Sequence, residues 1–297
     1  MSTTTYGGPR PPLPPPSRVD GPTGPWARLL HDLDTVGVGL VHASFAAWRP
    51  LLPPEEERRF LLGRDWARYS KLSGEQMRDR FLATRLLIRH TAAVALGTEP
   101  NSLELSYGLN GRVHLRGYDQ IDVSLSHTGD LLLCGITSLG VIGVDTEPLK
   151  RRLSGRDVET LMCTGPERLR LAATPDEERN GQLLALWTLK EAYSKALGQG
   201  LRFPFTEFGF RKEAGPGPAG HEPTGPGAAG DAETILLERS DGTPVADDTW
   251  RFATFPLSTG HLVALALQDT RRSGQPDTRA GTALNRQILA AIGSLGS

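Results

Sequence analysis

A single helical segment constrains the fold of this chain more than any other feature. Residues 182–197 contain neither proline nor glycine, and Gly198 and Gly200, which can end a helix, follow directly. At about 100° per residue, one arc of about 140° collects most of the apolar side chains. That arc comprises Ala185, Leu186, Leu189, Ala192, Tyr193, Ala196 and Leu197. The segment therefore predicts a helix with one side packed against a core.

The opposite side of this helix carries Trp187, Glu191, Ser194 and Lys195. Glu191 and Lys195 can be an ordinary surface pair, which contributes only about 0.3 kcal/mol. The bulky indole of Trp187 beside them instead favours a cleft or an interface over open water. Lys190 lies about 100° further round the helix, where a snorkelling lysine at the rim of the core is the default expectation.

A second informative segment, residues 141–147, contains Asp145 and Glu147. This apolar, partly β-branched run predicts a strand that forms a hairpin with residues 131–137. Alternation puts both carboxylates on one strand face, where they repel each other unless a cation lies between them. A solvated strand end before Pro148 is the simpler alternative. Oxygen ligands would favour Mg²⁺ or Mn²⁺ over zinc.

Together, these segments resemble the signature of the phosphopantetheinyl transferases. Residues 143–147 read Gly-x-Asp-x-Glu, and residues 187–200 read Trp-x-x-Lys-Glu-Ala-x-x-Lys-x-x-Gly-x-Gly. Two shorter family elements appear as Ser126-His127-Thr128 and as Gly111-Arg112-Val113, where the family usually has proline in place of Val113. The resemblance spans roughly residues 58–267 and is to the larger, single-chain, surfactin-synthetase-activating (Sfp) type.

The resemblance implies an α+β fold of two pseudo-symmetric lobes, each with a helix packed on a small, mainly antiparallel sheet, and with coenzyme A between them. It implies a holo-acyl-carrier-protein synthase that moves the 4'-phosphopantetheine arm of coenzyme A to a serine of an apo acyl or peptidyl carrier protein. Adenosine 3',5'-bisphosphate would leave. Asp145, Glu147 and Glu191 would hold Mg²⁺, or Mn²⁺. Glu191 would take the serine proton, and Lys195 would neutralise charge on the bridging or leaving phosphate.

The resemblance also implies which residues contact coenzyme A. Ser126 and His127 would meet a phosphate or the adenosine, although a lone histidine after a strand is more often structural or exposed. Arg112 would approach the nucleotide. Arg80 is the best positional match for the family's 3'-phosphate contact at the start of an arginine-rich helix. Residues that compete for the upstream contacts are Arg64, Arg68 and Lys71, although charge runs usually mark solvated faces.

The order of segments predicts how the chain is organised. Residues 1–25 are proline-rich and are expected to be a disordered tail. The N-terminal lobe is expected over 33–138 and the C-terminal lobe over 139–269. Residues 213–233, rich in Gly and Pro, would be a flexible insert, and 270–297 a polar tail. Further strands are expected at 36–43, 103–106, 122–126, 207–211, 234–238, 250–255 and 261–266, and further helices from Pro54, at 77–96 and at 165–172.

Composition narrows the class of protein further. The 297 residues include 33 Lys and Arg against 34 Asp and Glu, so nothing favours binding to nucleic acid or to a membrane surface. No apolar run could span a bilayer, no secretory signal is visible, and Cys134 and Cys163 suit free thiols. We expect a cytoplasmic monomer whose partners are coenzyme A and carrier proteins of fatty-acid, polyketide or peptide synthesis. A pyrophosphate-ester hydrolase and a silent coenzyme A or carrier-binding module are the alternatives.

Overall fold

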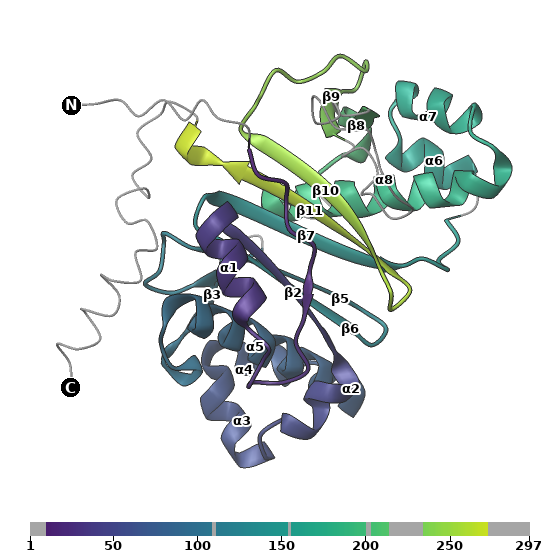
Figure 1. Cartoon of the computed structure of the whole chain (residues 1–297). Coiled ribbons are helices and arrows are strands. Elements are labelled where there is room, and N and C mark those ends of the chain that lie inside the picture. The colour runs from purple at the N-terminus through teal and green to yellow at the C-terminus, as the bar shows by residue number, and fades with distance from the viewer. Residues whose placement is uncertain (1–9, 109–110, 154–155, 200–202, 214–233, 273–297) are drawn as a thin grey trace, which may run out of the picture.

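Two lobes, each with a long helix packed on an antiparallel sheet, make up this protein (Figure 1). The computed structural model describes residues 10–108, 111–153, 156–199, 203–213 and 234–272. All of the predicted insert at 213–233 except residue 213, and most of the predicted C-terminal tail, lie outside these residues. Within them, no helix is long and apolar enough to cross a membrane. The arrangement is the α+β fold that the sequence predicted.

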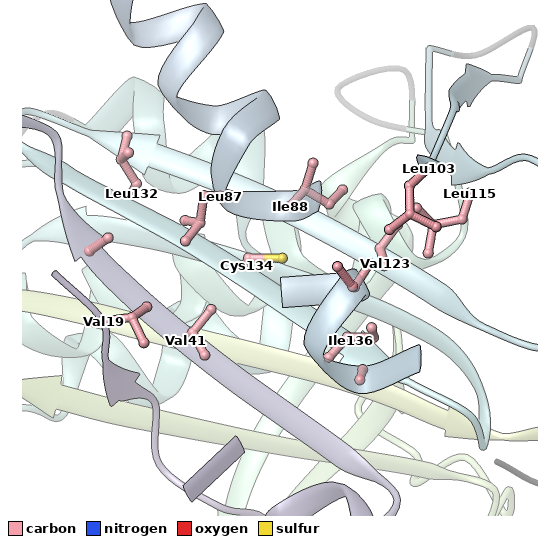
Figure 2. Packing of buried hydrophobic residues seen from close by; sticks show 14 of the residues in the cluster. Val19, Val41, Leu87, Ile88, Leu103, Leu115, Val123, Leu132, Cys134 and Ile136 are labelled. Atoms are coloured by element: carbon pink, nitrogen blue, oxygen red, sulfur yellow. The ribbon is translucent and has the colours of Figure 1, made fainter. Parts of the chain in front are cut away.

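The sheet of the N-terminal lobe has the strand order β1-β2-β6-β5. Its strands are β1 (Ser17–Arg18), β2 (Val38–Ser44), β6 (Leu131–Thr137) and β5 (Asp122–Thr128), antiparallel except for the β1–β2 pair. Helix α5 (Glu75–Leu96) packs on this sheet. Figure 2 shows its Leu87 and Ile88 near Cys134 of β6, in a cluster whose members are all buried. Burial of this apolar surface is the main force that holds the helix on the sheet.

Shorter elements surround this core. The helices are α1 (Ala27–Val36), α2 (Phe45–Trp48), α3 (Glu55–Leu62) and α4 (Trp66–Tyr69), and β3 (Leu105–Tyr107) pairs with β4 (Val113–Leu115). Single 3-10 turns lie at Arg49–Leu51, Gly63–Asp65, Pro100–Ser102, Phe205–Glu207 and Thr270–Arg272.

The C-terminal lobe has the antiparallel sheet β10-β11-β7, formed by Trp250–Leu257, His261–Asp269 and Gly140–Pro148. A separate pair joins β8 (Phe208–Glu213) to β9 (Thr234–Arg239). The helices are α6 (Arg156–Met162), α7 (Gly165–Ala172) and α8 (Asp176–Ala196). Tyr193 of α8 anchors the core, because its ring lies within 4.8–6.3 Å of five other aromatic rings.

Helix α8 is longer at its start than the sequence predicted. It begins at Asp176 rather than at residue 182, and it includes Gly181. Three acidic residues in its first turn, Asp176, Glu177 and Glu178, interact favourably with the positive end of the helix dipole. That local stabilisation carries the helix through a glycine that apolar periodicity alone would have placed outside it.

The two sheets meet across a third buried cluster. Val38, Leu40 and Leu133 come from the N-terminal lobe. The C-terminal lobe contributes Ile142, Val144, Val263, Leu265 and Leu267. Because this apolar interface is continuous with both sheets, the lobes form one folded unit rather than two independent ones.

The predicted hairpin between residues 131–137 and 141–147 is wrong. Both strands exist, but β6 pairs with β2 and β5, whereas β7 pairs with β11. The short turn between them therefore carries the chain from one sheet to the other. Apolar runs and a tight turn are local features, and they do not determine which distant strand completes each ladder.

The prediction of a disordered tail over residues 1–25 is wrong from residue 10 onward. Ser17 and Arg18 pair with β2, and Val19 is fully buried in the N-terminal core. The carbonyl of Val19 also accepts a hydrogen bond of 3.1 Å from the indole of Trp48. Proline loses little side-chain entropy when it is ordered, so proline-rich composition does not prevent packing at a sheet edge.

Candidate active site

Strand β7 presents Asp145 and Glu147 to helix α8. A Cβ atom on Gly143 would overlap the carbonyl oxygen of Ala192, so only glycine lets the helix backbone pass so close to the strand. Because alternate residues share a strand face, Asp145 and Glu147 project from the same face as Gly143. They line a cavity of about 410 Å³ together with Glu191 and Lys195 of α8. The structure thus brings the predicted carboxylates and lysine together.

Asp145 is held through one of its two oxygens. Its Oδ1 accepts 2.7 Å and 2.8 Å hydrogen bonds from Lys195 Nζ and Ser126 Oγ. Its Oδ2 is buried and has no hydrogen-bond partner among the described residues. A buried carboxylate oxygen without a donor is costly, so this atom is an unfilled ligand position.

Glu147 is held in a similar way. Its Oε1 accepts a hydrogen bond of 3.1 Å from the indole nitrogen of Trp187 and a very short one from Arg151. The Arg151 guanidinium also lies 5.2 Å from the centre of the Trp187 ring. Trp187 therefore faces the cleft, as its position on the helix indicated, and Arg151 is a site residue that the sequence analysis missed.

Glu191 lines the same cavity as these two carboxylates and interacts with the charge of each. Burial, followed by the charges of Asp145 and Glu147, raises its pKa to about 7, although Lys195 and Arg151 oppose the shift. Crowded carboxylates raise one another's pKa in this way when no cation separates them. Glu191 is thus poised to exchange a proton near neutral pH.

These side chains suit a hard divalent cation by their chemistry. Within the described ranges, no three acidic, histidine or cysteine side chains are already gathered as a metal site. The unpartnered Oδ2 of Asp145 and the raised pKa of Glu191 nevertheless mark a place that lacks positive charge. Carboxylate oxygens are the ligands that Mg²⁺ and Mn²⁺ prefer. The residues present therefore fit such an ion.

A second cavity of about 270 Å³ adjoins the first, and Leu125, His127 and Lys195 line both. Among the described residues, none of the side chains that line it is acidic, and its basic side chains are Arg68, Arg85, Arg112, His127 and Lys195. Arg85 is held in place by Asp65, at 3.2 Å, and by stacking 3.9 Å from the centre of the Phe81 ring. An acidic cavity and a basic one thus open onto each other between the lobes.

His127 lies where the two cavities join. Burial lowers its pKa, and the positive charges of Arg80, Lys195 and Arg85 lower it further. The imidazole is therefore neutral at neutral pH and can both donate and accept a hydrogen bond. Arg80 lies near enough for its charge to lower the pKa of this histidine. Its Nε is buried and has no hydrogen-bond partner among the described residues.

Comparison with known proteins identifies the family. The sequence profile of the 4'-phosphopantetheinyl transferase superfamily matches residues 141–241. Over 162 residues, the chain is 30% identical to the 4'-phosphopantetheinyl transferase HetI of Nostoc sp., which covers 52% of this chain and 68% of HetI. Over 182 residues, it is 27% identical to a 4'-phosphopantetheinyl transferase of Bacillus subtilis, which covers 59% and 80%. A Synechocystis sp. protein provisionally given the same name is 29% identical over 155 residues, only 62% of its own length.

The chain belongs to the 4'-phosphopantetheinyl transferase superfamily. The profile match includes the β7 carboxylates and all of α8, which supply the acidic side chains and Lys195 of the acidic cavity, whereas the β5 residues of that cavity lie outside the match. The basic cavity, by contrast, takes Arg68, Arg85 and Arg112 from the N-terminal lobe, outside the matched residues.

Not all predicted contact residues of this superfamily member lie together. Arg68 and Arg112 line the basic cavity. The Arg112 side chain pairs with Asp122 and donates to the carbonyl of Ile142 at 2.7 Å, so it also ties the lobes together. Arg64 is not brought to the site, because its side chain is 67% exposed and lies 3.5 Å from Glu104.

Lys190 is the main correction to the predicted helix face. A rim lysine was expected, but the side chain is fully buried, 2.8 Å from the equally buried Glu167. Its Nζ also donates to the carbonyls of Phe205 and Phe208 at 2.6 and 2.5 Å. Burial lowers the pKa of Lys190, and Glu167 opposes this shift. The 3-10 turn at Phe205–Glu207, the start of β8 and helix α7 supply these partners, and the periodicity of α8 cannot reveal them.

A third cavity, of about 420 Å³, lies on the far side of α8, between α7 and β8. Its lining is mainly apolar, and its charged groups include Glu167, which pairs with Lys190, and Arg170 and Arg211, which both pair with Glu238. It lacks the unfilled carboxylate position found beside Asp145. The candidate active site is therefore the pair of joined cavities between the lobes.

Proposed function

We propose that this protein transfers the 4'-phosphopantetheine arm of coenzyme A to a serine of an apo carrier protein. The observation that carries the proposal is the junction of an acidic cavity with a basic one at His127 and Lys195. Coenzyme A carries a pyrophosphate and, on its nucleotide, a further phosphate. Its binding therefore calls for both an acidic cavity, which can hold a cation, and a basic one. A cation beside carboxylates suits the pyrophosphate, and arginines suit the remaining phosphate.

The reaction requires little covalent chemistry from the protein. The serine oxygen attacks the phosphorus that carries pantetheine, a new P–O bond forms, and the bond to the nucleotide phosphate breaks. Adenosine 3',5'-bisphosphate leaves. Catalysis then depends on holding the two substrates in line and on neutralising charge at phosphoryl oxygens.

Glu191 is proposed to take the serine proton. Its position in the same cavity as Lys195 and the β7 carboxylates supports this role, because a general base must lie within hydrogen-bond reach of the proton that it takes. Lys195, one turn further along α8 and 2.7 Å from Asp145, would neutralise the leaving phosphate. Both side chains line the acidic cavity, so they would act on one phosphorus.

The nucleotide is proposed to bind on the basic side. Arg68, Arg80 and Arg112 would contact its phosphates, as the sequence indicated, and Arg85 is added from the cavity lining. Neutral His127 would hydrogen-bond a phosphate oxygen or the adenosine. Arg64 is left out because its guanidinium is exposed beside Glu104.

Asp145, Glu147 and Glu191 are proposed to hold Mg²⁺ or Mn²⁺. When bound, the ion would neutralise charge on the phosphoryl oxygens during transfer. We further propose the surfactin-synthetase-activating type, serving acyl or peptidyl carriers, and a monomer. One chain supplies both cavities from its own two lobes, so a second copy is not needed to complete the site.

Intact-mass measurement of an apo carrier protein tests the function directly. Incubation with coenzyme A, Mg²⁺ and this protein is expected to add one phosphopantetheine to the carrier serine, and EDTA is expected to prevent it. Glu191→Gln is the matched control, because it keeps the size of the side chain and removes the base. Coenzyme A cleavage without any carrier product would indicate a hydrolase. Binding without any chemistry would indicate a silent module.

A further inference from the structure

We propose that Ser126 is a positioning residue that fixes the Asp145 carboxylate so that its Oδ2 faces the divalent cation. The inference rests on the proposed function, and it assigns Ser126 to the metal ligand rather than to coenzyme A. The Ser126 hydroxyl donates to Asp145 Oδ1 at 2.8 Å, and Oδ2 is left buried without a partner among the described residues.

The position of Ser126 in the cavities supports this assignment. Ser126 lines the acidic cavity but not the basic one, whereas its neighbours Leu125 and His127 line both. A serine has a single O–H to donate. While that proton is shared with Asp145, it cannot also be donated to a phosphate oxygen, which only accepts. A direct phosphate contact through this hydroxyl would therefore require the bond to Asp145 to break.

The bond between Ser126 and Asp145 spans the two lobes. Ser126 is fixed by the N-terminal sheet, opposite Leu133 of β6, and Asp145 by the C-terminal sheet, opposite Ala264 of β11. Strands β5 and β7 are the edges of these sheets. The carboxylate is thus oriented by a donor that belongs to the other lobe.

Two further side chains of β5 bridge the same edges. Asp122 accepts from the amide of Ile142 at 2.7 Å, and Ser124 accepts from the amide of Val144 at 3.0 Å. These bonds hold the β7 backbone, whereas the bond of Ser126 holds a side chain. Ser124 therefore offers a matched control, because it lies on the same strand face and also bridges the lobes through a serine hydroxyl.

Lys195 binds the same oxygen of Asp145, but it cannot orient the carboxylate as well as Ser126 does. Its ammonium is a point charge on a flexible four-carbon stem. Ser126 is 7% exposed and its short side chain comes from a paired strand, so its hydroxyl has little freedom. Partners of this kind usually change metal affinity about 10- to 100-fold when they are removed.

Titration of Mn²⁺ alone into the full-length protein, followed by electron paramagnetic resonance of the free ion, measures the effect. Ser126→Ala is expected to raise the Kd for Mn²⁺ at least about tenfold. Ser126→Thr retains the hydroxyl and is expected to stay close to wild type, as is Ser124→Ala. Calorimetric titration of coenzyme A in EDTA is expected to give the same affinity for wild type and Ser126→Ala. If alanine lowers the melting temperature, Ser126→Cys repeats the test at similar volume.

Three results would overturn the assignment. One is an unchanged Mn²⁺ affinity in Ser126→Ala while Asp145→Ala loses it. Another is an equal loss in Ser124→Ala, because the effect would then come from loosening the strand edges. The third is a loss of coenzyme A affinity larger than the loss of Mn²⁺ affinity. If Asp145→Ala itself binds Mn²⁺ like wild type, the proposed metal site fails as well.

Discussion

Lys190 and Lys195 are two lysines of one helix, each paired with a carboxylate, and they differ in almost every other respect. Lys190 and Glu167 are both completely buried, with Nζ 2.8 Å from the carboxylate. Lys195 and Asp145 are 2.7 Å apart, but their side chains are 29% and 9% exposed and line the active-site cavity. The Lys190 ammonium is fully used by Glu167 and two carbonyls, whereas one oxygen of the Asp145 carboxylate has no hydrogen-bond partner among the described residues.

The difference separates structure from chemistry within a single motif. The satisfied pair fixes α8 to α7 and to the start of β8, and has no capacity left for a ligand. The unsatisfied pair faces a cavity and keeps ligand capacity at the expense of stability. Similar distances between lysine and carboxylate therefore do not imply similar roles. The hydrogen-bonding capacity left on the paired carboxylate is the better guide to which pair binds a ligand.

The largest stability effect should come from breaking the buried pair. Lys190→Met leaves the buried Glu167 carboxylate without a cation and with only the amides of Thr164 and Phe210 as donors, which should lower the free energy of unfolding by about 3 kcal/mol. Urea unfolding followed by circular dichroism measures it. Adding Glu167→Gln to Lys190→Met is expected to restore part of the loss. A loss below about 1 kcal/mol in the single variant would mean that Glu167 takes up a proton or reaches water.

Lys195→Met should give the opposite result. Asp145 keeps its hydrogen bond from Ser126 and Lys195 itself is 29% exposed, so the loss of stability should be smaller than in Lys190→Met, but transfer to a carrier should slow at least about 100-fold because one charge at the phosphate is lost. At 1.36 kcal/mol per decade, that is about 2.7 kcal/mol of transition-state stabilisation. Single-turnover mass spectrometry of the carrier measures the rate. Equal unfolding losses in the two lysine variants would remove the distinction drawn between them.

A similar comparison between arginines should give a smaller effect. The charge of Arg80 lowers the pKa of His127, and its buried Nε has no hydrogen-bond partner in the part of the chain that the structure describes, whereas Arg64 is exposed beside Glu104. Arg80→Gln is expected to raise the KM for coenzyme A about tenfold, since a hydrogen bond to a charged group contributes about 1.5–3 kcal/mol. The KM for dephospho-coenzyme A should change less. Arg64→Gln should leave both unchanged, and an equal rise in both arginine variants would argue against site-specific binding.

Glu191 offers a pH-dependent test on the metal-free protein. Its pKa is raised from 4.5 to about 7 in the folded state, so the folded protein binds the proton more tightly than the unfolded chain. Stability from this group is therefore present below about pH 4.5 and is lost as the pH rises through about 7. Glu191→Gln should be more stable than wild type by about 1 kcal/mol at pH 8 in EDTA, after allowance for solvent screening, and close to wild type at pH 4.5. A difference that does not depend on pH would exclude Glu191 as its source.

Much of this architecture could be predicted from local sequence patterns. Strand β6 and helix α7 have the predicted bounds, because apolar runs and a Thr164 cap signal determine them locally. Strand alternation placed Asp145 with Glu147 and helical periodicity placed Glu191 with Lys195, but only the family resemblance implied that the two pairs converge. Arg85 and Arg151 were missed, because their roles depend on neighbours distant in sequence or on loop geometry. The burial of Lys190 depends on Phe205 and Phe208, which periodicity within α8 cannot reveal.

Each lobe has one buried cysteine, and the rate at which each thiol is labelled reports how the two lysine variants affect that lobe. Cys134 lies in the N-terminal core and Cys163 in the C-terminal core, and burial raises the pKa of each thiol to about 12. Cys163 also senses the charges of Glu167 and Lys190 directly. In the folded protein, both should resist a thiol-specific reagent, because the thiolate is the reactive form.

Lys190→Met should speed the labelling of Cys163 more than that of Cys134, since the broken pair lies beside Cys163 and local opening exposes the nearest buried groups first. Lys195→Met should change neither rate by more than about twofold, because its partner Asp145 lies in a different part of the lobe. Peptide mapping of the labelled protein separates the two sites. Equal acceleration at both cysteines in Lys190→Met would mean that the two lobes open together. Their shared interface of Ile142, Val144 and Leu133 would then couple them into one cooperative unit.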